Sequence, residues 1–167
     1  MSELLDQIPS EMSAYLVDAG RLLLAVLCGA AIGLEREINQ KGAGLRTHIM
    51  IAAGACLFSL VGLEMHERFP NGDPLRLLQG MLLGVGFISG GVIFTNRGLV
   101  KGLTTAAGLW VLTGVGMAAG LGYYFVAIFG TVLSLAVIGW MKHAEKLIHR
   151  NEEPGSEKED SADSPGV

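Results

Sequence analysis

Residues 102–141 read GLTTAAGLWVLTGVGMAAGLGYYFVAIFGTVLSLAVIGWM, forty residues without one charged side chain. An α-helix rises about 1.5 Å per residue, so about 20 residues cross the roughly 30 Å hydrocarbon core of a bilayer. The run is therefore long enough for two crossings, and the glycines of the segment 120–123 indicate the turn between them. We expect two membrane-spanning helices here, at 102–121 and 123–141.

The whole chain has the same apolar character. Half of its 167 residues are hydrophobic and 17% are charged, whereas soluble domains carry about 25% charged residues. Shorter uncharged runs upstream predict three more spans, at 14–34, 46–63 and 75–95. The predicted fold class is an all-α membrane protein, a bundle of about five transmembrane helices.

The first two uncharged runs, 22–34 and 49–63, contain only 13 and 15 residues. Either these helices thin the membrane, or charged residues at their ends lie within its depth. The first run could also be the apolar core of a cleaved signal peptide. Because the chain starts with acidic residues and no basic segment, we interpret it as an uncleaved span.

Basic residues predict the orientation. With five spans, nine of the twelve lysines and arginines fall on one side of the membrane and three on the other. Since lysine and arginine accumulate in cytoplasmic segments, the N-terminus is expected outside and the C-terminus in the cytoplasm. The nine are Arg36, Lys41, Arg46, Arg97, Lys101, Lys142, Lys146, Arg150 and Lys158, and the three are Arg21, Arg68 and Arg76.

Two segments are predicted: a transmembrane domain at 1–145 and a charged, mostly disordered cytoplasmic tail at 146–167. From Asn151 onward six acidic residues accompany one lysine, so the tail carries most of the net charge of −4 and the body is nearly neutral. A neutral body excludes general nucleic-acid binding. Cys28 and Cys56 have no metal-ligand spacing around them. Neither a metal, a cofactor nor a catalytic constellation is expected, so we do not expect an enzyme.

Glycines recur at intervals of four. Such pairs give a helix a smooth face on which another backbone can lie closely. We expect these faces to pack the bundle, although sequence does not separate contacts within one chain from self-association into a homo-oligomer. The pairs are Gly29 and Gly33, Gly80 and Gly84, Gly86 and Gly90, and Gly116 and Gly120.

The predicted topology brings polar residues together at the cytoplasmic ends of the helices. Acidic residues and a histidine add nothing to topology, so a functional cluster is expected around Glu35, and Arg46 is its expected partner. The alternative, that the bases only set topology, is favoured for Arg97 and Lys101. The candidate site residues are Glu35, Arg36, Arg46, Thr47, His48, Asn96, Lys101, Thr104 and Thr105.

Four motifs in order are familiar: GLERE at 33–37, GAGLRTH at 42–48, GVGFISGGVIF at 84–94 and VKGLTTAA at 100–107. With them, the chain resembles the transmembrane domain of the MgtC/SapB family from about Arg21 to Met141. The resemblance implies a multi-pass protein of the bacterial inner membrane, linked to growth under magnesium limitation and to survival in acid or inside a host. Longer members carry a soluble domain after the fifth helix, where this sequence has its acidic tail.

The resemblance also implies a function. The best-known members are regulators that bind membrane partners, among them the F-type ATP synthase. We expect a non-enzymatic membrane protein that regulates by protein contact. The alternative is an oligomeric channel or transporter for an ion or a small, lipid-like solute, with the polar cluster at its inner mouth.

Overall fold

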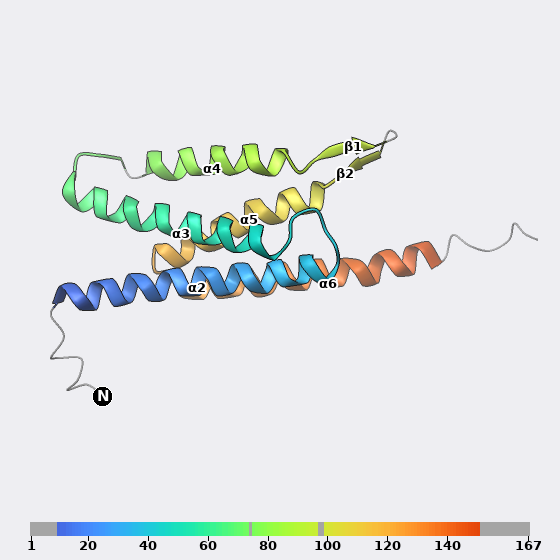
Figure 1. Cartoon of the computed structure of the whole chain (residues 1–167), viewed down its shortest axis with the longest axis horizontal. Coiled ribbons are helices and arrows are strands. Elements are labelled where there is room, and N and C mark those ends of the chain that lie inside the picture. Colours follow the sequence, from blue (N-terminus) through green and yellow to red (C-terminus); the bar gives the residue numbers. More distant parts are fainter. Residues whose placement is uncertain (1–9, 74, 97–98, 151–167) are drawn as a thin grey trace, which may run out of the picture. The chain divides into compact units, whose positions relative to one another are not determined.

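The computed structural model describes residues 10–73, 75–96 and 99–150, and in this part of the chain five helices and one hairpin follow one another (Figure 1). The prediction of an all-α membrane protein with about five helices is confirmed, with one small addition of β-structure. The elements are α2 (Ser10–Ile38), α3 (Leu45–Arg68), α4 (Leu75–Gly90), β1 (Phe94–Asn96), β2 (Leu99–Lys101), α5 (Leu103–Gly120) and α6 (Tyr124–Arg150).

The chain divides into two compact units, Met1–Leu135 and Ala136–Val167, with the boundary inside α6. In the first unit α5 packs against α2, α3 and α4, and α3 packs against α2 and α4. Small and medium apolar residues fill the space between the helices. The most completely buried ones are Ala25, Ile32, Ala52, Cys56, Leu109, Leu112, Ala119 and Ala127.

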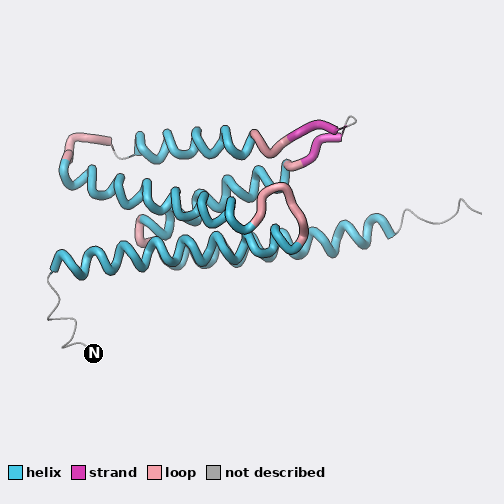
Figure 2. The backbone as a smooth tube through the Cα atoms, viewed as in Figure 1, coloured by secondary structure: helices cyan, strands magenta, loops and turns pink. Residues whose placement is uncertain are grey.

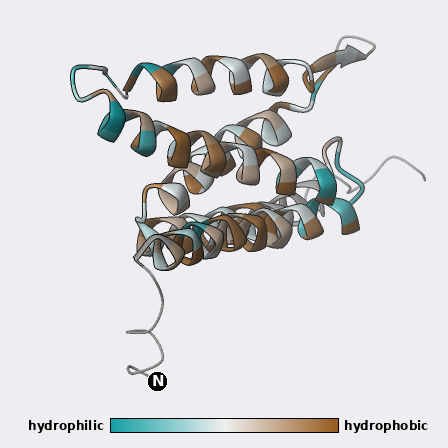
Figure 3. Ribbon diagram, turned by 60° about the vertical axis from the view of Figure 1, so that its left-hand side comes forward, coloured by the Kyte–Doolittle hydropathy of each residue, from teal (hydrophilic) through white to brown (hydrophobic). Residues whose placement is uncertain are grey.

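Three helices are long and apolar enough, by length and composition, to cross a membrane: 12–38 of α2, 45–68 of α3 and 103–120 of α5. α4 and the apolar part of α6 at 124–140 are shorter. Figure 3 shows hydrophobic residues along the helices and hydrophilic ones gathered near the connections between them. The turn predicted at 120–123 is confirmed: α5 ends at Gly120, and Gly122 takes a positive φ of 83°.

The first two helices are longer than their uncharged runs. α2 has 29 residues and α3 has 24, which correspond to about 44 and 36 Å. Charged residues therefore continue the first helix beyond its uncharged run, because α2 includes Glu35, Arg36 and Glu37. That these charged residues lie within the depth of the membrane stays a prediction.

The third predicted span ends too late. α4 stops at Gly90, and residues 94–96 and 99–101 form an antiparallel hairpin in which Phe94 faces Lys101 (Figure 2). Two consecutive glycines and the β-branched Val92 and Ile93 have poor helix propensity, which explains this end. The hairpin returns to α5 through Gly102, whose φ is +91° and where a Cβ atom would collide with the Val92 carbonyl. A side chain is excluded at that position.

The predicted boundary at 145 stays a prediction, since the structure describes only part of the tail. α6 continues to Arg150, so residues 146–150, predicted as tail, are helical. Residues 151–167 lie outside the described residues.

Candidate polar site at one end of the bundle

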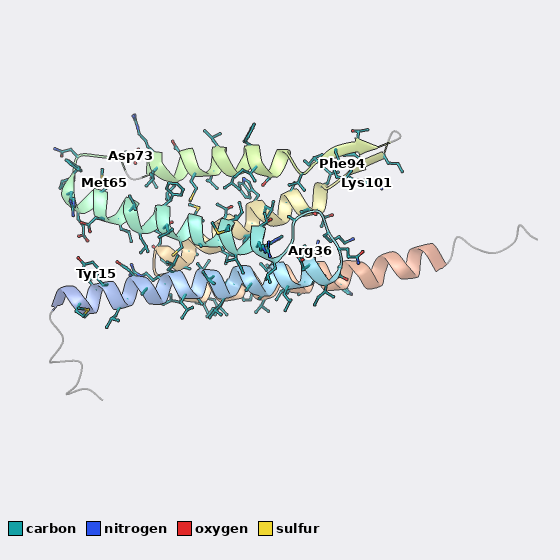
Figure 4. All side chains as sticks on the ribbon, viewed as in Figure 1. Tyr15, Arg36, Met65, Asp73, Phe94 and Lys101 are labelled. Carbon is teal, nitrogen blue, oxygen red and sulfur yellow. The ribbon has the colours of Figure 1, made fainter. Side chains whose placement is uncertain are left out.

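Three parts of the chain lie together at one end of the first unit. They are the last turn of α2, the start of the hairpin and the start of α5. Figure 4 shows Arg36, Phe94 and Lys101 at that end, and Tyr15, Met65 and Asp73 at the other. Arg36 and Lys101 thus lie at the same end of the first unit, as their assignment to one side of the membrane requires. Which end faces the cytoplasm stays a prediction.

The centre of this polar end is an ion pair between neighbours on α2, in which Arg36 is buried and Glu35 is partly buried. The Nε atom of Arg36 donates to Oε2 of Glu35 at 2.6 Å, and the two side chains are 5% and 19% exposed. The Asn39 amide donates to the other carboxylate oxygen, Oε1, at 2.8 Å and to the Glu35 carbonyl at 2.6 Å. Both oxygens of the Glu35 carboxylate therefore have a donor, which is what a buried carboxylate requires.

His48 lies next to this pair. Gly33, three residues before Arg36 on α2, is so close to α3 that a Cβ atom there would be 2.9 Å from the Cβ of His48. The imidazole is completely buried, and its Nδ1 atom lies 2.9 Å from the Gly44 carbonyl. A carbonyl only accepts, so Nδ1 carries the proton of this hydrogen bond. The opposite nitrogen, Nε2, has no hydrogen-bond partner among the residues that the structure describes.

The loop between α2 and α3 is closed by Glu37. Its Oε2 atom accepts the backbone N–H of Leu45 at 2.9 Å, in the first turn of α3. A carboxylate at a helix N-terminus satisfies a free donor and complements the helix dipole. Gly44 precedes the helix, and a Cβ atom at that position would collide with the Glu37 carboxylate.

The predicted cluster is only partly assembled. Its buried members are Arg36, His48 and Thr105, and Glu35 is partly buried. Arg46 is exposed, and the ion pair of Glu35 is with Arg36, so the predicted partner of Glu35 is wrong. Successive helical residues seldom face each other, so the spacing of the two residues does not predict this pair. The remaining exposed members are Thr47, Lys101 and Thr104.

The predicted site residue Asn96 lies in β1, and its side chain is outside the described part of the chain. Asn39 was not predicted from the sequence, although an asparagine four residues after a helical glutamate is placed to reach it.

Within the described residues no three His, Cys, Asp or Glu side chains are placed to share a metal ion.

Half of the predicted glycine pairs pack helices within the chain. Gly29 and Gly33 of α2 lie against α3, and so do Gly116 and Gly120 of α5. A Cβ atom at Gly29 would be 2.9 Å from the Cβ of Ala52, and one at Gly116 would collide with the Ala52 carbonyl. α3 is therefore held closely between two glycine faces.

The glycines of α4 behave differently, and the expectation of packing within the chain is wrong for them. Apart from the neighbouring backbone of α4 itself, no atom of the described residues comes within 4 Å of a Cβ built at any of the four. α4 uses Met81, Val85 and Ser89 as its buried side. The open glycines are Gly80, Gly84, Gly86 and Gly90.

Long apolar helices, close glycine contacts and a buried ion pair define a multi-pass α-helical membrane protein. Comparison with known families agrees: residues 22–147 match the MgtC family, and the chain belongs to it. It is a multi-pass protein of the bacterial inner membrane.

Three relatives illustrate the similarity. The chain is 41% identical to the putative magnesium transporter YhiD of Escherichia coli K12, over 71% of this chain and 57% of the relative. It is 38% identical to protein SapB of Bacillus subtilis, over 72% and 56%. With protein MgtC of Salmonella typhimurium the identity is 36%, over 77% and 54%. The aligned region thus spans less than two thirds of these relatives, and no solved structure matches the chain.

Proposed function

We propose that this chain is a non-enzymatic regulator that acts by contact with another protein of the inner membrane, and that α4 provides the contact surface. The observation that carries the proposal is the set of four open glycines on α4. Each glycine in a helix costs about 1 kcal/mol relative to alanine. That cost is offset where a neighbouring helix approaches closely, as α3 does at Gly116, but no described neighbour comes this close to the four glycines of α4.

The side chains between these glycines strengthen the argument. Leu83 and Phe87 are one turn apart on α4 and are 78% and 85% exposed. Large side chains beside glycine hollows are a surface that a second membrane helix can fit, because small residues allow close approach. The family resemblance suggests adaptation to magnesium limitation, acid or host stress as the setting, and the F-type ATP synthase as one candidate partner.

The test is complementation of a deletion strain at low magnesium. Gly84→Leu should insert normally and fail to restore growth, because the new side chain keeps the partner away. Gly54→Leu is the matched control, since Gly54 on α3 also has no neighbour within 4 Å but stands outside the α4 surface. Full growth with Gly84→Leu at normal protein abundance would refute the proposal.

A second candidate is an oligomeric channel or transporter. Two observations favour it: a buried ion pair inside a helix that is long enough to span the membrane, and the unpartnered Nε2 of His48 beside it. Ionisable groups at membrane depth often mark ion pathways. Flux of an ion such as Mg²⁺ into vesicles that hold the purified chain would support this candidate, and the absence of flux would favour the regulator.

A further inference from the structure

The β1–β2 hairpin has neither of its two faces covered by the described chain. In the antiparallel register Phe94 faces Lys101 and Asn96 faces Leu99, so Phe94, Leu99 and Lys101 share one face. Phe94 is 54% exposed and Leu99 is 67% exposed. On the opposite face Val100 is 53% exposed. An isolated two-stranded hairpin is marginally stable in water, so something else should cover these apolar side chains.

The length of α4 indicates where the hairpin lies. α4 has 16 residues, which correspond to about 24 Å. This length is shorter than the roughly 30 Å hydrocarbon core. α4 starts next to Asp73, at the end opposite the hairpin (Figure 4). If α4 starts at one interface, it therefore ends within a few ångströms of the other, and the hairpin follows close to that second interface.

The hydrogen bonding of the hairpin limits its depth. Its strands pair with each other over three residues each, and their outer edges have no neighbouring strand in the described chain. Unpaired backbone groups are not tolerated in hydrocarbon in contact with lipid. The backbone must therefore be at headgroup level, where water and polar headgroups reach the edges, while apolar side chains can extend inward.

We propose that the hairpin is an interfacial anchor, with Phe94 and Leu99 inserted into the boundary between headgroups and acyl chains and Lys101 directed to lipid phosphates. Phe87, in the last turn of α4, is exposed as well. A lysine with a long apolar stem suits this position, because the stem lies along the apolar surface and the ammonium reaches the phosphates. The anchor holds the connection between α4 and α5 at a fixed depth.

The test uses the full chain in phosphatidylcholine vesicles with acyl chains brominated at carbons 6 and 7, which quench tryptophan at shallow depth. Phe94→Trp is placed in a Trp110→Phe, Trp140→Phe background; both native tryptophans are exposed. Bromolipid should quench Phe94→Trp at least half as much as Leu83→Trp on α4. Asn71→Trp, in the loop between α3 and α4, is the polar control. Quenching of Phe94→Trp no stronger than that of Asn71→Trp would overturn the proposal, whether water or a second copy covers the hairpin.

A spin label gives an independent readout if the tryptophan variant folds poorly. Cys28 and Cys56 are buried, so a thiol reagent should label Leu99→Cys selectively in the folded protein. The label should collide more often with oxygen than with a water-soluble nickel chelate. Equal or greater access of the chelate contradicts membrane insertion.

Discussion

The Nε atom of Arg36 lies 2.6 Å from Oε2 of Glu35, the residue directly before it on α2. Neighbouring side chains on a helix point about 100° apart, so this pair forms only because both side chains bend toward each other. Asn39 holds the second oxygen of the same carboxylate. The result is a compact polar unit at the end of a helix that is otherwise apolar.

Loss of the carboxylate should destabilise the protein. Glu35→Ala leaves the Arg36 guanidinium, 5% exposed, without its counter-charge, and breaking a buried pair costs about 3 kcal/mol or more. Because Glu35 is itself partly exposed, we expect the lower end of that range. The free energy of unfolding of each variant is measured in bicelles. Arg46→Ala is the control and should change it by less than about 0.5 kcal/mol; equal effects of both changes would show that the pair is not buried in the membrane.

Asn39 should act through Glu35. Asn39→Ala removes the donor to Oε1 and should lower the free energy of unfolding by about 1 kcal/mol. Asn39→Asp has nearly the same shape but puts a second negative charge beside the carboxylate, so it should be worse than alanine. If Asn39→Asp is as stable as the native chain at neutral pH, the hydrogen bond from Asn39 to Glu35 does not contribute to the stability of the protein.

The two kinds of glycine should respond differently to a larger side chain. Gly116→Leu forces α5 away from Ala52 of α3, and overpacking of this kind costs about 1–3 kcal/mol. Gly84→Leu meets open space and should leave the melting temperature of the isolated chain in detergent unchanged. A large loss of stability in Gly84→Leu would show that α4 packs more closely than described.

The topology can be checked with reporter fusions. The excess of basic residues predicts a cytoplasmic reporter after Met141 and an external one within residues 64–73. Activity of a periplasmic reporter fused after Met141 would contradict the predicted orientation.

The sequence was sufficient for the helices, because uncharged runs and the bilayer thickness together limit where spans can lie. It was less informative about their ends: the uncharged run 77–96 gives no sign that α4 stops at Gly90, since strand and helix residues are equally apolar there. Only the glycine pair and the β-branched residues after it favour that end.

The polar site was harder to predict than the fold. The sequence indicates candidate site residues because charges and a histidine are unusual at membrane depth. The pairing of Glu35 with Arg36 could not be predicted, because the side-chain rotamers that bring the two together depend on tertiary packing. Glycine spacing also could not separate Gly116, which lies against α3, from Gly84, where an added Cβ would meet no neighbouring helix of the described chain. The interval of four residues is the same in both helices.

Photo-crosslinking from position 83 tests the central claim, contact of α4 with another membrane protein, most directly. A photoreactive amino acid in place of Leu83, which is 78% exposed on α4, is activated in native membranes. We predict a defined crosslinked product with a second inner-membrane protein, and its loss when Gly84→Leu is added but not when Gly54→Leu is added. Crosslinks to lipid alone, or a product that Gly84→Leu leaves unchanged, would contradict the account.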